Sequence, residues 1–103
     1  MPKGYSEKFV ERLNRLAPVT LELQLAMICV QANISATFVA KAMKVSRMAV
    51  HSWFRGDSRM AKSKIKLAET LLHIFKEDFE KGILPLNNYR ISKEYYRSIM
   101  EPK

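Results

Sequence analysis

Residues 35–56 read SATFVAKAMKVSRMAVHSWFRG, and the architecture expected of the chain follows from this segment. Ser35 and Ser46 are residues that often cap helices, and each precedes a short segment of helical spacing. Gly56 follows the second segment, as a residue that readily ends a helix in the left-handed conformation. We therefore expect two short helices joined by a turn of three residues at 44–46.

Small and apolar residues occupy the positions where two such helices would pack together. Ala40 lies midway along the first helix, where only a small side chain lets the second helix cross closely. The other positions expected to be buried are Val39, Met43, Val45, Val50 and Trp53. The exposed side of the second helix then carries Arg47, Met48, His51, Ser52 and Arg55.

Helical spacing continues through the rest of the chain, so we expect an all-α fold, a compact multi-helix bundle. The expected helices are one capped by Ser6 and closed by Pro18 after about Leu16, one over Leu21–Ala32 capped by Thr20, one over 62–81 ended by Gly82, and one from Ser92 to about Met100. We divide the chain into an N-terminal helix (1–19), a core (20–82) and a connector with a C-terminal helix (83–103). That last part belongs to the same domain or serves dimerisation.

The positive charge is concentrated in one part of the chain. Lys and Arg number 18 against 10 acidic residues, for a net charge of +8. Residues 41–66 hold eight of these cations and one acidic residue, Asp57, whereas residues 67–103 hold six charges of each sign. A cluster of this kind is typical of a surface that binds a polyanion such as DNA.

Several other classes of protein are not indicated. Cys29 is the single cysteine, which suits a reducing compartment, and residues 1–4 begin no apolar run of signal-peptide length. The longest apolar run, 25–30, is too short to span a bilayer, so we expect a cytoplasmic protein. His51 and His73 lack the spacing of metal ligands, and no paired carboxylates or glycine-rich phosphate loop indicates an enzyme, a cofactor or a small-molecule ligand.

The run Val45-Ser46-Arg47, Val50 and Trp53-Phe54-Arg55-Gly56 resembles a motif of the lambda-repressor-like family, the Cro/cI or XRE type of phage and bacterial regulators. The likeness covers about residues 21–75. It implies a five-helix core whose helix-turn-helix (35–56) places 47–55 as the recognition helix in the major groove. It also implies a sequence-specific regulator, a repressor of phage or mobile-element type, that binds a pseudo-palindromic operator as a homodimer.

Three residues depart from the family pattern. Lys44 stands where the family usually has a glycine in the turn, and Ala36 stands where a glutamine often grips a phosphate. Phe54 replaces a glutamate that normally faces water. We therefore expect Phe54 either to be buried by an added element, such as the C-terminal helix, or to contribute to an interface.

The resemblance implies roles for individual residues. The residues expected to face base edges are Arg47, Met48, Ser52 and His51, although a histidine there is more often solvated or packed. The residues expected to contact phosphates are Ser46, Arg55, Arg59, Lys62 and Lys64, with Ser35 and Thr37 as substitutes for the missing glutamine. The candidate interface residues are Phe54, Tyr95, Tyr96 and Ile99.

The sequence is also compatible with two other hypotheses. Each exposed cation can be a solvated charge with no ligand. For Arg59 and Lys62 this hypothesis is as well supported by the sequence as phosphate contact. The helix-turn-helix scaffold can also serve as a protein adaptor that binds a host enzyme or polymerase through Phe54 and the C-terminal aromatic residues. Such an adaptor would hold its partner at high salt and would not retain DNA.

Overall fold

Six helices form the regular structure of the computed structural model, which describes residues 5–16 and 20–100 apart from the side chains of Asn14 and Leu16. They are α1 (Glu7–Leu16), α2 (Leu21–Ala32), α3 (Ala36–Met43), α4 (Arg47–Arg55), α5 (Lys62–Glu80) and α6 (Tyr89–Met100). No strand occurs within these described ranges, which confirms the all-α class. Pro18, expected to close α1, lies outside the described residues.

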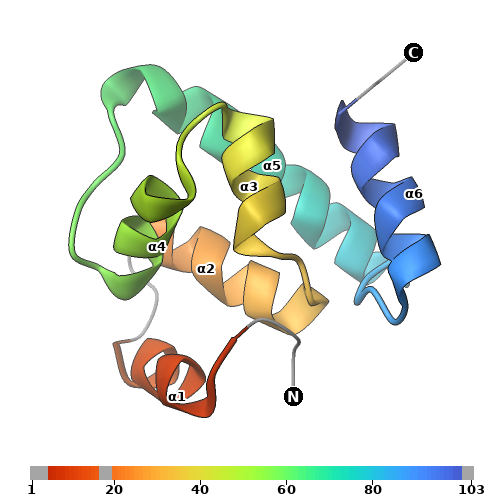
Figure 1. Cartoon of the computed structure of the whole chain (residues 1–103), viewed down its shortest axis with the longest axis horizontal. Helices are drawn as coiled ribbons and strands as arrows, with labels where there is room; N and C mark the ends of the chain where they lie inside the picture. The colour runs from red at the N-terminus through yellow and green to blue at the C-terminus, as the bar shows by residue number, and fades with distance from the viewer. Residues whose placement is uncertain (1–4, 17–19, 101–103) are drawn as a thin grey trace.

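Helix α2 is the central element of the bundle. Its N-terminus is capped by Thr20, whose Oγ1 accepts a hydrogen bond from the Leu23 amide at 3.2 Å. Helices α1, α4 and α5 all pack against it, as Figure 1 shows. Because α2 is apolar on nearly every side, it is stable only when other helices surround it, as the sequence predicts.

Helices α3 and α4 cross as predicted from the small residue between them. Ala40 is 4% exposed at the centre of α3, and Val39 and Met43 beside it are fully buried. Helix α4 packs on both α3 and α2. The side chain of Val50 completes this contact with no exposed surface. The two short helices are thus held by the core rather than by their own length.

The connector between α5 and α6 is part of the packed structure. Leu84 and Leu86 are 3% and 1% exposed, and the Leu86 amide donates to the Ala32 carbonyl at 2.9 Å. Asn33 Nδ2 donates back to the Leu86 carbonyl at 2.7 Å. These bonds tie the connector to the end of α2, so α6 returns beside α3 (Figure 1).

Helix α6 begins earlier than the sequence predicts. Ser92 was the expected cap, but the helix starts at Tyr89, and Asn88 Oδ1 accepts a hydrogen bond from the Ile91 amide at 2.9 Å. The Ser92 hydroxyl instead donates to the Asn88 carbonyl at 2.9 Å, from inside the first turn. The prediction was wrong because asparagine caps a helix as well as serine does, and Asn88 comes first in the chain.

Candidate nucleic-acid interface

The turn between α3 and α4 contains a lysine in a conformation that favours glycine. Lys44 has φ 58° and ψ 46°, in the left-handed region, which costs an L-residue about 1 kcal/mol. The Lys44 amide donates to the Lys41 carbonyl at 3.3 Å, and the Val45 amide donates to the Ala40 carbonyl at 3.0 Å. The predicted bend at Lys44 is confirmed, and these bonds close the end of α3.

Ser46 caps the helix that follows this turn. Its Oγ accepts a hydrogen bond from the Ala49 amide at 3.1 Å, and the residue is exposed. A hydroxyl group that accepts such a bond keeps its own O–H as a donor. The first amides of a helix also lack partners within the helix, and its dipole favours an anion at this end. Ser46 is thus placed to donate to a phosphate oxygen.

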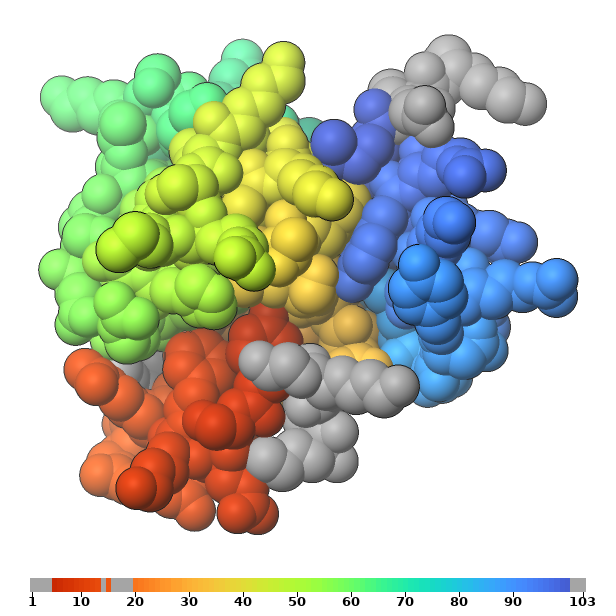
Figure 2. All heavy atoms as spheres, viewed as in Figure 1, coloured from red at the N-terminus to blue at the C-terminus, as the bar shows by residue number. Residues whose placement is uncertain are grey.

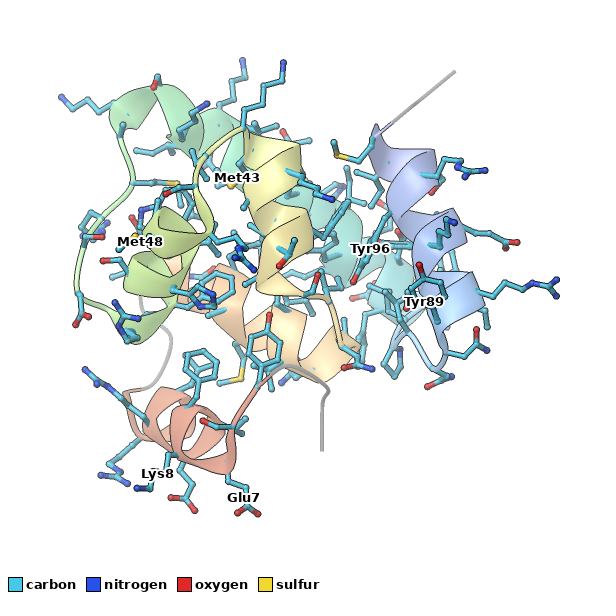
Figure 3. The ribbon with its side chains drawn as sticks, viewed as in Figure 1. Glu7, Lys8, Met43, Met48, Tyr89 and Tyr96 are labelled. Carbon is cyan, nitrogen blue, oxygen red and sulfur yellow. The ribbon has the colours of Figure 1, made fainter. Side chains whose placement is uncertain are left out.

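Helix α4 has one buried side and one exposed side. The buried side is formed by Val50, Trp53 and Phe54. Arg47 and His51 are exposed on the other side, and Met48 keeps 82% of its surface exposed. In Figure 3 Met48 points outward from α4, whereas Met43 points into the bundle. Among the described residues, the Arg47 side chain makes no ion pair or hydrogen bond, so this side is available to a ligand.

Ser52 does not lie fully on this exposed side. It is half-buried, and its Oγ shares a hydrogen bond of 2.7 Å with the Oγ of Ser58 in the following loop. Ser52 thus lies at the edge of the exposed side of α4, where its hydroxyl group bonds to the following loop. Its contact with base edges stays a prediction.

The polar residues predicted to contact phosphate near α3 differ in their surroundings. Thr37 is exposed in the first turn of α3. Ser35 is half-buried: its Oγ accepts from the Phe38 amide, and its own amide donates to the Tyr96 hydroxyl, each at 3.1 Å. Ser35 thus caps α3 and attaches α6, and Thr37 is the more exposed of the two substitutes for the missing glutamine.

The four predicted cationic contacts also divide into two kinds. Lys62 is exposed at the start of α5. Lys64 is half-buried, and its Nζ donates to the Met43 carbonyl at 2.9 Å, where it fixes the start of α5 against the end of α3. Arg55 Nε bonds to Asp57 at 2.8 Å, and Arg59 bonds to Glu22. Three of the four cations therefore have a structural partner as well as exposed surface.

Glu22 is the important residue that sequence reasoning missed. This carboxylate is 3% exposed, and its two oxygens accept from Arg59 Nε at 3.0 and 3.1 Å. Its Oε2 also accepts from the Met60 amide at 2.8 Å. The available signal was a lone acidic residue in the otherwise uncharged helix Leu21–Ala32. A buried charge of this kind requires partners, and here they hold the loop after α4.

The pKa of Glu22 reflects the same contacts. Burial of the carboxyl group alone would raise its pKa. The hydrogen bonds from the Met60 amide, from its own amide and from Arg59 outweigh this effect, so the pKa lies below its ordinary value of 4.5. Glu22 is therefore ionised at neutral pH, and it anchors the loop as a charged acceptor.

Two of the four candidate interface residues are buried within the chain. Phe54 is 2% exposed, so the predicted alternative of burial is the one observed, but α1 packs there rather than the C-terminal helix. Tyr95 is 8% exposed, and its hydroxyl group donates to Asp78 Oδ2 at 2.7 Å. Both side chains therefore stabilise the fold, and the expectation that they form an interface is wrong.

The other two candidate interface residues are half-buried in the same region. Tyr96 stacks on Phe38 with ring centroids 4.1 Å apart, and Figure 3 shows its side chain directed toward α3. Ile99 packs against the core one helical turn later. Each keeps only part of its surface exposed, which leaves little for a partner to contact.

Other kinds of site receive no support within residues 5–16 and 20–100. No three side chains of His, Cys, Asp or Glu are close enough there to hold a metal ion. None of the described helices is both long enough and apolar enough to cross a membrane. The exposed side of α4 combines the charge of Arg47 with the accessible apolar atoms of Met48.

Comparison with known proteins adds no relative: no family model, curated protein or solved structure matches the chain.

Proposed function

We propose that this protein binds double-stranded DNA through the exposed side of α4 and regulates transcription. The observation that carries the proposal is the pair Arg47 and Met48, both exposed in the first turn of a helix whose opposite side is buried. The first turn of a helix that enters the major groove is where side chains meet base edges. Eight of the cations of the chain lie within residues 41–66 around this turn.

The two exposed residues suit different features of the groove. An arginine can donate two hydrogen bonds to the O6 and N7 atoms of guanine, a contact worth about 1–3 kcal/mol of discrimination. Arg47 fits this role because its guanidinium group has no partner among the described residues. Met48 offers an apolar surface that can press on a thymine methyl group. His51 lies one turn after Arg47 and extends the exposed row along α4.

The surrounding surface supplies contacts that do not depend on sequence. Ser46, Thr37 and Lys62 are exposed close to the ends of these helices. Arg55 and Arg59 use Nε for their structural partners, so their outer nitrogens remain as donors to phosphate. In Figure 2, α3, α4 and the following loop form one continuous face. Such contacts give affinity that falls steeply with salt.

The resemblance to the lambda-repressor-like family supports the finer parts of the proposal. Proteins of this kind act as homodimers on two half-sites about 34 Å apart, one helical turn of DNA. A repressor of phage or mobile-element type, working in the cytoplasm, is the form that the resemblance favours. The adaptor hypothesis is less well supported, because Phe54 and Tyr95 are buried and cannot receive a partner.

Selection from a pool of random duplexes tests this function. We expect the protein to enrich related sequences with two-fold symmetry and a spacing of about 10 base pairs between half-site centres. The logarithm of its association constant for the enriched duplex should fall linearly with the logarithm of the salt concentration. Absence of enrichment, together with no retention of any duplex at low salt, would contradict the proposal, and salt-insensitive capture of a protein partner would then favour the adaptor.

A further inference from the structure

The outer side of α6 is a second surface with concentrated positive charge. Arg90, Lys93 and Arg97 follow one another at spacings of three and four residues, which places them on one side of the helix. All three are exposed, whereas Tyr95 and Tyr96 pack the opposite side of α6 against the core. Among the described residues, the side chains of Arg90 and Lys93 make no ion pair or hydrogen bond. These two cations are therefore available to a ligand.

An exposed aromatic ring lies beside this row of cations. Tyr89 begins α6 and keeps 79% of its surface exposed, although aromatic side chains usually bury much of their area in a core or an interface. Figure 3 shows Tyr89 at the start of α6, whereas Tyr96 is directed toward α3 and stacks on Phe38. The ring of Tyr89 is therefore accessible to a flat ligand.

The ring and the cations line one surface hollow. It has a volume of about 400 Å³, and its lining consists of Tyr89, Arg90, Lys93, Glu94 and Arg97. Three of these residues are cationic and one is acidic, so the hollow favours an anion. The row from Arg90 to Arg97 spans about 10 Å along the helix, which is the length of about three nucleotides in a stacked strand.

Tyr89 also lines a second hollow, of about 190 Å³, together with residues of the connector. One of them is Asn87, which is exposed and whose side-chain amide makes no hydrogen bond with a described residue. Such an amide can both donate to and accept from the edge of a base. The two hollows thus offer a ring for the face of a base, an amide for its edge and cations for its phosphate.

This surface is separate from the exposed side of α4. Helix α3 packs against both α4 and α6, and Figure 1 shows these two helices on opposite sides of it. A duplex keeps the faces of its bases inside the stack, where a protein ring cannot reach them. The bases of a single strand can unstack and place their faces on an aromatic side chain. The exposed ring therefore favours a single strand over a duplex.

We propose that the outer side of α6 binds single-stranded nucleic acid, with a base stacked on Tyr89 and phosphates paired with Arg90 and Lys93. The contact tolerates any base, because every base has a flat face that can stack. The inference goes beyond the proposed function, since it uses no residue of α4.

Fluorescence anisotropy of a labelled oligothymidylate, which forms no duplex with itself, tests this inference. We expect Tyr89→Ala to weaken binding about fivefold or more, because it removes the stacked contact of one base. Tyr89→Phe keeps the ring and should bind as the wild type does. Arg90→Ala should reduce the dependence of the logarithm of the association constant on that of the salt concentration by about 0.7, the value for one phosphate of a single strand. Lys8→Ala, which removes a cation from α1, should change neither quantity.

The same proteins separate this surface from α4. Arg47→Ala should leave oligothymidylate binding unchanged, and Tyr89→Ala should leave binding of the selected duplex unchanged. Equal oligothymidylate binding by wild type and Tyr89→Ala, or no binding by wild type at low salt, would overturn this inference. An oligoglutamate that binds as tightly would assign the surface to an acidic protein partner and would overturn it as well. Failure of duplex selection, with oligothymidylate binding that depends on Tyr89, would overturn the proposed function alone.

Discussion

The two ends of α4 are built in opposite ways. At the C-terminal end, Trp53 and Phe54 are buried, and Arg55 pairs with Asp57. At the N-terminal end, Arg47 and Met48 are exposed, and the side chain of Arg47 contacts no described group that it could pair with. The helix is therefore fixed at one end and presents side chains at the other.

This difference shows how basic residues of similar appearance in the sequence take different roles. Arg59 lies in the loop that follows α4 and bonds to a buried carboxylate, so its first role is to hold that loop. Arg47 contributes nothing comparable to the fold. Substitutions at the two ends should therefore separate effects on the unfolding free energy from effects on DNA binding.

The largest effect is expected for Phe54→Ala. Phe54 is 2% exposed between α4 and α1, and removal of a buried phenyl group typically costs about 3–5 kcal/mol of unfolding free energy. Chemical denaturation followed by circular dichroism measures the loss. Phe54→Leu is the control and should cost clearly less, because it keeps most of the apolar volume. A fully stable Phe54→Ala protein would show that the side chain is not part of the core.

The next largest effect is expected for Glu22→Gln. An amide group has a single acceptor oxygen for the donors of Met60 and Arg59, so one buried bond is lost at a cost of about 2 kcal/mol. For a chain of this length the melting temperature should fall by about 10 °C. Glu69→Gln, at an exposed position on α5, should leave it unchanged. Equal melting temperatures for the two variants would contradict the anchoring role of Glu22.

The contribution of Glu22 should also depend on pH. Its pKa is lower in the folded protein than its ordinary value of 4.5, so its contribution is present above that value. The contribution is lost as the pH falls through the folded-state pKa, because the unfolded chain then binds the proton more readily. Denaturation of wild type and Glu22→Gln at about pH 6 and about pH 3 measures it. The difference in unfolding free energy between the two proteins should be smaller at the lower pH. A difference that does not change with pH would contradict the prediction.

A smaller effect of opposite sign is expected for Lys44→Gly. Lys44 has φ 58°, so glycine should relieve the strain and raise the unfolding free energy by about 1 kcal/mol. Lys44→Ala removes the same charge but keeps a Cβ atom, and it should show no such gain. A gain of the same size for both variants would indicate that charge rather than backbone strain explains the change.

Much of the fold follows from local signals in the sequence. Thr20, Ser35 and Ser46 cap the helices as expected, and the apolar spacing of α3 and α4 identifies their buried sides. These features depend on residues a few positions apart. The start of α6 was missed because Asn88 and Ser92 offer competing caps, and the choice depends on how the connector packs.

The site was less predictable, because its contacts join distant parts of the chain. Glu22 meets Arg59 and Met60 across 37 and 38 residues, which no local pattern reveals. Phe54 could be recognised as unusual, but only the placement of α1 shows what covers it. Exposure of Arg47 and Met48 was predictable because it follows from the periodicity of α4 alone.

Folding and specific DNA binding, measured together for Arg47→Ala, test whether α4 reads base edges. Because Arg47 is exposed and unpaired among the described residues, its melting temperature should equal that of the wild type. Its affinity for the selected duplex should fall about tenfold or more, with affinity for random duplex nearly unchanged. An equal loss on both duplexes, or no loss on either, would contradict the account of α4 as the base-reading helix.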